Sequence, residues 1–290
     1  MSLTAISSKK NTKARLISGV MYSLCVGFTG FILLILLLVV GYLISIGLQS
    51  VSFAFFTQEG IAYGAEGYPG GMKNGLLGTL VLVSMAAVVG IPIGMLAGIF
   101  LSEYGANSRL ASPVRFVADV LAGVPSIVVG ILGYELLVVP IGHYNGWAGA
   151  LTLAFIMVPI VARTTEEMLR LVPHSYREAS IALGATKART ILRVVVPSAA
   201  GSLITGVMLA LARVAGETAP LLFTALGSRF VTVNPNEPFP SLTKQIYDYA
   251  TGPYEAQKKM AWAGILVLIG LIFVFNLTVR LIARSRHGTA

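Results

Sequence analysis

The sequence predicts an all-α integral membrane protein with six transmembrane helices and both termini in the cytoplasm. Composition, recurrent long apolar runs and the placement of basic residues together support this prediction. Of the 290 residues, 56% are hydrophobic and 11% are charged, and the mean hydropathy is +0.81. Because a soluble domain carries about 25% charged residues, this composition places the chain in a lipid bilayer.

Six apolar runs are long enough to cross a hydrocarbon layer of ~30 Å, which takes about 20 helical residues. They lie at about 19–48, 76–101, 117–140, 147–162, 198–226 and 260–282. None of them alternates apolar with polar residues, which excludes a strand-based barrel. The first run is longer than the roughly 7–15 apolar residues of a signal peptide, so we expect it to be a retained span.

Basic residues gather on one side of these spans. If the N-terminus is cytoplasmic, 15 Lys and Arg lie in inside segments and five in outside segments, the bias that fixes orientation in membranes. The predicted organisation is a cytoplasmic tail (1–18), a transmembrane domain (19–283) and a second cytoplasmic tail (284–290). Two outside segments, 49–74 and 227–259, are rich in turn-forming residues and are predicted loops. The basic residues thus indicate topology and not a nucleic-acid partner.

Several function classes are excluded by what the sequence lacks. There is one cysteine, Cys25, and the three histidines are scattered, so no metal site is predicted. No nucleophile with an evident base and no paired catalytic carboxylates occur in the spans, so we expect no enzyme activity. The chain also lacks a GxxxxGK[ST] loop, so any energy from ATP must come through another polypeptide.

The inside segment 163–197 is polar and helical over most of its length. Ser175 and Glu178 have capping-box spacing, which predicts that a short helix begins at Ser175. Gly184 is well placed to end that helix in a left-handed conformation. Small side chains on a projecting helix allow another protein to approach closely. An ordinary interfacial connector is the alternative.

This helix carries a recognisable signature, formed by Glu178-Ala179-Ser180, Gly184 and Val196-Pro197. It is similar to the Glu-Ala-Ala-x-x-x-Gly motif, ending in Leu-Pro, of ABC-importer permeases. Ser180 and Val196 depart from that pattern by small or isosteric changes. The resemblance implies a MetI-like permease fold in which 163–197 is the coupling segment. It also implies that Glu178, Ala179 and Gly184 dock on an ATPase subunit.

A longer match, ARVAGETAPLLFT at 212–224, is similar to the permeases of phosphate-specific ABC importers, and 123–128, 246–247 and 261–263 extend the resemblance over about 75–282. It implies a permease subunit for inorganic phosphate in the bacterial inner membrane. The implied partners are a sister permease forming a heterodimer, two ATPase subunits and a periplasmic phosphate-binding protein. The ATPase subunits would bind ATP and Mg²⁺, and this chain would hold no cofactor.

Two charged residues, Arg213 and Glu217, lie in the fifth apolar run. A charge at the centre of a span costs about 2.5–3.5 kcal/mol, so both should face protein or water. At i and i+4 they share a helix face, and Gly216 and Pro220 beside them predict a kink. One hypothesis is that Arg213 binds passing phosphate, while Glu217 holds the guanidinium in place or accepts from a protonated phosphate oxygen. The other is a structural pair that holds two helices in register.

Arg163, at the end of the fourth run, is a predicted second anion contact near the inner exit. The alternative is an interfacial anchor that reaches lipid headgroups. A competing function is a secondary anion transporter that uses Glu217 and Asp119 as proton carriers. Such a transporter would need no docking helix, so dependence of uptake on ATP separates the two functions.

Overall fold

The computed structural model describes residues 3–60, 70–105 and 108–287. The described residues form helices joined by turns and loops, with one isolated β-bridge, between Leu226 and Phe239. Four helices are long and apolar enough to cross a membrane, or six if each of two bent helix pairs counts as one span. The predicted all-α membrane fold is therefore confirmed. Residues 61–69 of the first predicted outer loop lie outside the described residues.

The helices follow one another along the whole described chain. In order they are α1 (Leu3–Gly47), α2 (Phe53–Thr57), α3 (Lys73–Ile99), α4 (Ala111–Gly123), α5 (Ser126–Gly133), α6 (Val139–Ile141), α7 (Gly146–Arg170), α8 (His174–Ala182), α9 (Lys187–Thr190), α10 (Val196–Ser198), α11 (Ala200–Ala215), α12 (Ala219–Thr224), α13 (Leu242–Thr251) and α14 (Glu255–His287). Three short π-helical turns lie between them: η1 (Phe100–Tyr104), η3 (Tyr134–Val138) and η4 (Ile191–Val195).

Two of the predicted spans are broken helices. The third run becomes α4 followed by α5, η3 and α6, with a bend of 103° after Gly123. The bend has a local cause: Pro125 disfavours a helical conformation in the residue before it, and Val124 is extended with ψ 132°. The second bent pair is Lys187–Ser198 followed by Ala200–Ala215, with a bend of 72°. The fifth run is divided again after Ala215, where α11 ends, and α12 begins at Ala219.

Close packing of α3 against α7 forms the centre of the bundle. Gly90, Gly94 and Gly98 of α3 are buried, and a Cβ atom on Gly94 would lie 2.7 Å from the Cβ of Val161. A Cβ atom on Gly98 would lie 2.5 Å from the Cβ of Thr165. Glycine repeats of this kind let helix backbones approach closely, and α4, α5, α11 and α12 also pack on α7.

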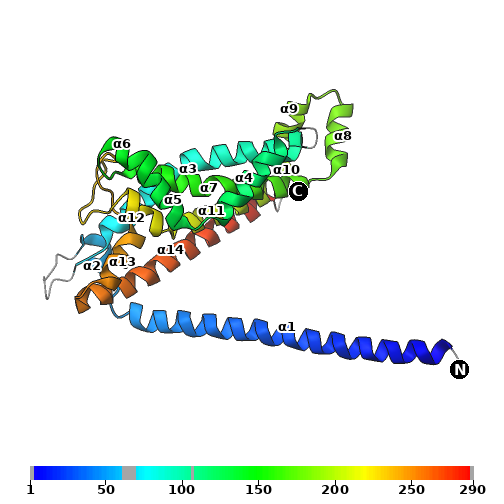
Figure 1. Ribbon diagram of the computed structural model, residues 1–290, viewed down its shortest axis with the longest axis horizontal. Helices are drawn as coiled ribbons and strands as arrows, with labels where there is room; N and C mark the ends of the chain where they lie inside the picture. The colour runs from blue at the N-terminus through cyan, green and yellow to red at the C-terminus, as the bar shows by residue number, and fades with distance from the viewer. Residues whose placement is uncertain (1–2, 61–69, 106–107, 288–290) are drawn as a thin grey trace.

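The ends of the bundle differ in what they carry. Figure 1 shows that the start of α1, helix α8 and the last turns of α14 lie toward one end, while α2, α6 and α13 lie toward the other. We name these the α8 end and the α13 end. The predicted cytoplasmic segments thus share the α8 end, as the predicted topology requires.

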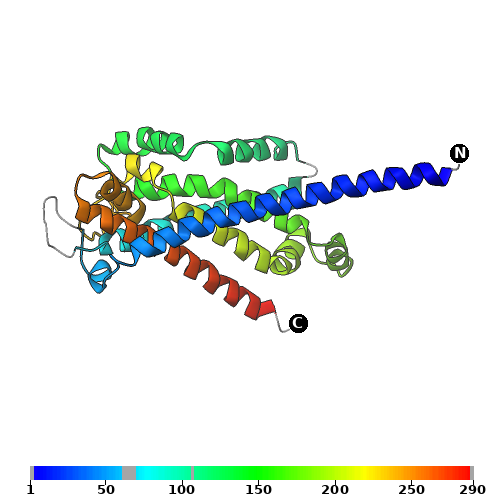
Figure 2. The same cartoon turned by 90° about the horizontal axis from the view of Figure 1, so that it is seen from below.

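Helix α1 stands apart from the other helices over most of its length (Figure 1). Seen from below, it crosses in front of them, and its start extends beyond the rest of the chain (Figure 2). Near its last turns the ring centroids of Tyr42 and Trp262 are 5.8 Å apart, and Gly47 faces Leu266. Earlier apolar side chains are exposed, as is Leu37 at 72%, which suits contact with lipid. The helix begins at Leu3, so residues 3–18 of the predicted tail continue it, because no proline interrupts them.

A larger residue at Gly98 should destabilise the bundle. Gly98→Leu forces a side chain against the Thr165 side chain and the carbonyl oxygen of Ala162, and overpacking of this kind costs about 1–3 kcal/mol. We expect a lower thermal stability in detergent, measured by size-exclusion chromatography after heating. Gly27→Leu is the matched control, since a Cβ there meets nothing within 4 Å. Equal stability of the two variants would contradict the packing assignment.

Candidate functional site: a cavity with a central arginine

A cavity of about 380 Å³ lies between α4, α5, α7 and α11. Its lining is mostly apolar and includes Leu121, Ala122, Val124, Ser126, Val129, Ile156, Ile160, Leu209 and Arg213. Arg213 is the charged member of this set. Its guanidinium can donate hydrogen bonds to a small anion in this cavity.

The guanidinium of Arg213 is only loosely paired. Its Nη2 lies 3.8 Å from Oε1 of Glu217, and the Arg213 side chain is 55% exposed whereas that of Glu217 is 13% exposed. This separation exceeds hydrogen-bond distance. The predicted partner is therefore adjacent, but the planar donors of Arg213 are available to another acceptor.

A break in the helix positions this pair. Helix α11 ends at Ala215, and α12 begins at Ala219 with Pro220 in its first turn, where a missing amide costs no hydrogen bond. Gly216 lies between them. Thr243 of α13 donates its hydroxyl to the carbonyl of Glu217 at 2.9 Å. The break thus places Arg213 at the end of α11, where the helix dipole favours a cation.

Helices α5 and α12, which follow the breaks after α4 and α11, pack on each other. A Cβ atom on Gly130 of α5 would lie 2.8 Å from Cα of Pro220 in α12. A Cβ atom on Gly133 would meet Oγ1 of Thr152 in α7. Helices α5 and α12 therefore form one unit in close backbone contact, beside the cavity.

Arg163 lies within α7 and not at its end. It is one helical turn from Ile160 of the cavity, on the side toward the α8 end. Its Nε is 3.0 Å from Oδ1 of Asp119, and its Nη1 is 3.5 Å from Oε2 of Glu166. The side chain is thus turned toward α4 and two carboxylates, which disfavours the headgroup-anchor alternative.

Glu166 is a functional candidate that the sequence reasoning missed. Its side chain is 1% exposed, and it accepts from Arg115 of α4 at 2.7 Å and from Arg170 at 2.6 Å. The arginines surround the Glu166 carboxylate within α7. This helix continues to Arg170, beyond the predicted end of the span at residue 162. The missed signal is the i, i+3, i+7 spacing of Arg163, Glu166 and Arg170.

The projecting helix differs from its predicted start. Helix α8 begins at His174, after Pro173 at its N-cap, with no side-chain cap hydrogen bond. The predicted capping box is therefore wrong: proline starts the helix before Ser175, whose hydroxyl is then within the helix. Past its end, Gly184 has φ +82°, in the left-handed region where glycine is unstrained.

One face of α8 is exposed and the other is anchored. Glu178, Ala179 and Gly184 are exposed. Arg177 turns inward, and its guanidinium donates to Oε1 and Oε2 of Glu103 at 2.6 and 3.0 Å. It also donates to the carbonyls of Leu169 and Val172 at 2.9 and 2.7 Å. This anchor, which joins α8 to η1 and to the end of α7, was also missed, because Glu103 and Arg177 are far apart in the sequence.

Comparison with known proteins places this geometry in a wider group. The family model described as "Binding-protein-dependent transport system inner membrane component" matches residues 90–288. The phosphate transport system permease protein PstA of Haemophilus influenzae is 43% identical over 82% of this chain and 84% of its own length. PstA of Yersinia pestis is 42% identical over 83% of this chain and 81% of its own.

More distant relatives and solved structures agree. PstA 1 of Mycobacterium tuberculosis strain H37Rv is 39% identical over 77% of this chain and 73% of its own. A chain of the inward-facing MetNI methionine ABC transporter has a TM-score of 0.58 and 23% identity, covering 73% of this chain and 92% of that chain. This likeness confirms the predicted permease fold.

Removing the charge of Glu166 should separate α4 from α7. Glu166→Gln leaves three arginines around a neutral group, and breaking a buried ion pair costs about 3–5 kcal/mol. We expect a clear loss of thermal stability in detergent. Glu167→Gln, an exposed neighbour on the same helix, is the control and should change stability little. Wild-type stability of Glu166→Gln would show that the ion-pair network contributes nothing.

Loss of Arg177 should free α8 from the bundle. Arg177→Gln removes the paired guanidinium from Glu103 and from two carbonyl oxygens, so the segment 172–184 should exchange its amide hydrogens faster. Hydrogen exchange followed by mass spectrometry checks this directly. Arg189→Gln, an exposed arginine in α9, should leave the same peptides unchanged. Equal exchange in both variants would mean that Arg177 does not hold the helix.

Proposed function

This chain belongs to the family of binding-protein-dependent transport system inner membrane components, and we propose that it is the phosphate-carrying permease subunit of an ATP-driven importer in the bacterial inner membrane. It forms part of the translocation path and is not an enzyme; ATP is hydrolysed by separate subunits. The relatives named as phosphate permeases support phosphate as the solute. The single observation that carries the proposal is Arg213 in its apolar cavity.

Arg213 is the central phosphate contact in this proposal. Its planar donors match two oxygens of an oxyanion, and the 3.8 Å separation from Glu217 leaves them available. Glu217 limits the affinity, because a carboxylate beside the arginine opposes a second anion, and a transport site must also release its solute. Arg163, one turn farther toward the α8 end, then receives phosphate by exchanging the carboxylate of Asp119 for the passing anion.

In the proposed mechanism, helix α8 transmits the movement of the ATPase to the transmembrane helices. Its exposed residues Glu178 and Ala179, with Gly184, dock on an ATPase subunit that binds ATP and Mg²⁺. Movement of the ATPase passes through Arg177 to Glu103 and to the end of α7. Helix α7 also carries Arg163 beside the path, so closure of the ATPases and opening of the cavity are parts of one movement.

The proposed assembly has this chain beside a sister permease, above two ATPase subunits and below a periplasmic phosphate-binding protein. Both termini and α8 face the cytoplasm, and the α13 end faces the periplasm. The concentration of basic residues in segments of the α8 end supports this orientation.

Neutralising Arg213 should abolish phosphate uptake without preventing assembly. Arg213→Gln removes the cation of the cavity, and Arg213→Lys keeps the charge but loses the planar fork, so uptake should be absent in the first and partial in the second. The measurement is ATP-dependent uptake of labelled phosphate into proteoliposomes that contain the whole importer. Lys259→Gln, an exposed residue of the α13 end, is the charge control.

Two results would contradict the proposal. Normal uptake by Arg213→Gln would remove the arginine from the path. Uptake by this chain in proteoliposomes without an ATPase partner would instead support the secondary anion transporter, in which α8 has no docking role.

A further inference from the structure

The carbonyl oxygen of Glu217, at the break between α11 and α12, finds no helical donor in the described part of the chain. The residue three positions on is Pro220, which has no amide hydrogen, and the amide of Leu221 donates to the carbonyl of Thr218 at 3.2 Å. The hydroxyl of Thr243 in α13 supplies the donor instead, at 2.9 Å. Thr243 is 4% exposed, so water competes little for this hydrogen bond.

The start of α13 is held in place independently of this hydrogen bond. The amide of Leu242 donates to the hydroxyl of Thr79 in α3 at 2.8 Å. A Cβ atom on Gly78 of α3 would clash with the carbonyl oxygen of Pro240, so the two backbones are in close contact there. The donor to Glu217 is therefore mounted on α3 through the first turn of α13.

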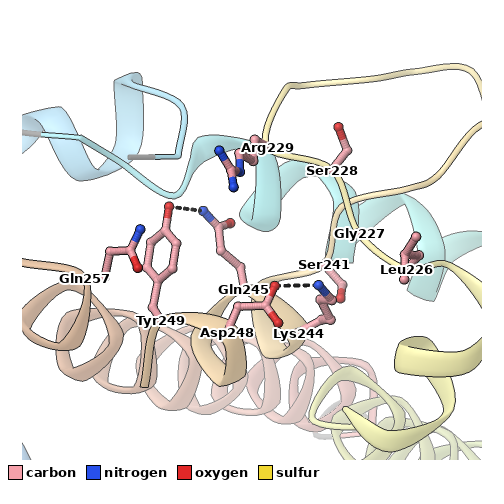
Figure 3. Close-up of a pocket in the computed structure, with 10 residues that line it drawn as sticks. All are labelled: Leu226, Gly227, Ser228, Arg229, Ser241, Lys244, Gln245, Asp248, Tyr249 and Gln257. Atoms are coloured by element: carbon pink, nitrogen blue, oxygen red, sulfur yellow. Dashed lines mark hydrogen bonds and ion pairs between the residues drawn. The ribbon is translucent and has the colours of Figure 1, made fainter. Parts of the chain in front are cut away.

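The rest of α13 is also stabilised without Thr243. Its residues Lys244, Gln245, Asp248 and Tyr249 line a polar cavity of about 240 Å³ at the α13 end (Figure 3). Within the helix Lys244 forms an ion pair with Asp248, and Gln245 donates to the hydroxyl of Tyr249 at 3.2 Å. Removal of the Thr243 hydroxyl should thus leave α13 folded and change only its hold on the break.

Glu217 is held from both sides of its backbone. Its amide donates to the carbonyl of Val214 at 3.1 Å, and its carbonyl accepts from Thr243. Because Glu217 lies outside both helices, these two hydrogen bonds restrict its backbone torsions and hence the direction of its side chain. In this position Oε1 of Glu217 stays 3.8 Å from Nη2 of Arg213, beyond hydrogen-bond distance.

We propose that Thr243 is a positioning residue of the transport site, which keeps the Glu217 carboxylate from closing onto Arg213 and so leaves the guanidinium available to the solute. The part of Arg213 in phosphate transport rests on the proposed function. Without the Thr243 hydroxyl the torsions of Glu217 are released, and a closer ion pair with Arg213 is favoured, since opposite charges attract more strongly at shorter distance. Such a pair competes with the anion for the same donors.

The decisive measurement is the rate at which phenylglyoxal, a reagent that modifies free guanidinium groups, labels Arg213. The full chain is copurified with its partner subunits into phosphatidylcholine nanodiscs, and labelled peptides are quantified by mass spectrometry, with exposed Arg193 as the internal standard. Thr243→Val should slow the labelling of Arg213 about fivefold, the change in population that corresponds to one hydrogen bond. General loosening of α13 would instead expose Arg213 further and speed its labelling.

Three variants control for the substitution itself. Thr243→Ser keeps the hydroxyl and should label at the wild-type rate. Thr251→Val is the matched control, because it removes a threonine hydroxyl of the same helix that donates to the carbonyl of Tyr247 at 2.8 Å, far from the break; it should also label at the wild-type rate. Thr243→Ala lacks the hydroxyl without the bulk of valine and should slow the labelling as Thr243→Val does.

Glu217→Gln gives a readout that a packing role of Thr243 would not move. A neutral amide forms no ion pair with Arg213, so adding Thr243→Val to Glu217→Gln should leave the labelling rate unchanged, a non-additive result expected for residues that act through one another. Unchanged or faster labelling in Thr243→Val alone, or equal slowing with and without Glu217→Gln, would overturn the inference.

The consequence for transport is measured by ATP-dependent phosphate uptake into proteoliposomes that contain the whole importer. Thr243→Val should take up phosphate more slowly than Thr243→Ser, and equal uptake by the two would remove Thr243 from the transport site. Labelling of Arg213 requires neither ATP nor phosphate, so its outcome does not depend on which solute the chain carries. The proposed function is judged separately, by uptake in Arg213→Gln.

Discussion

Burying an ion requires compensating charge in place, and this constraint governs how the α8 end of the molecule is built. The carboxylate of Glu166 is removed from solvent between α4 and α7, where an uncompensated charge would be strongly unfavourable. Three arginines supply the compensation, so α4 is held against α7 while glycines hold α7 against α3. Helices α4 and α7 also form walls of the cavity that contains Arg213. The shape of that cavity therefore depends on the ion pairs around Glu166.

Features that depend on neighbouring residues could be predicted from the sequence. The long apolar runs predicted an all-α membrane fold, and Gly184 marked the end of α8. The position of the break around Gly216 and Pro220 also follows from local backbone chemistry, since proline cannot continue the hydrogen-bond ladder of the preceding turn. Each of these features involves residues within one or two helical turns of one another.

Features that depend on residues far apart in the sequence could not be predicted from it. Glu103 and Arg177 are 74 positions apart and Arg115 and Glu166 are 51 apart, and a charge pattern alone does not say which carboxylate meets which arginine. The size of the α4–α5 bend also depends on packing, because Pro125 determines where the chain turns and not how far. The predicted capping box failed for a similar reason: two overlapping start signals, Pro173 and Ser175, compete, and only the folded backbone shows which one acts.

The contact between Gly130 and Pro220 has a consequence for how the permease can move. Helices α5 and α12 are joined by this contact, and each is preceded by a non-helical linker, at 124–125 and 216–218. Gly133 of α5 also packs on Thr152 of α7, and Asn145 at the start of α7 donates its amide to the carbonyl of Thr224 in α12. A reorientation of α5 must therefore carry α12 with it and either move α7 or repack on it, while the two linkers absorb the change in backbone torsions.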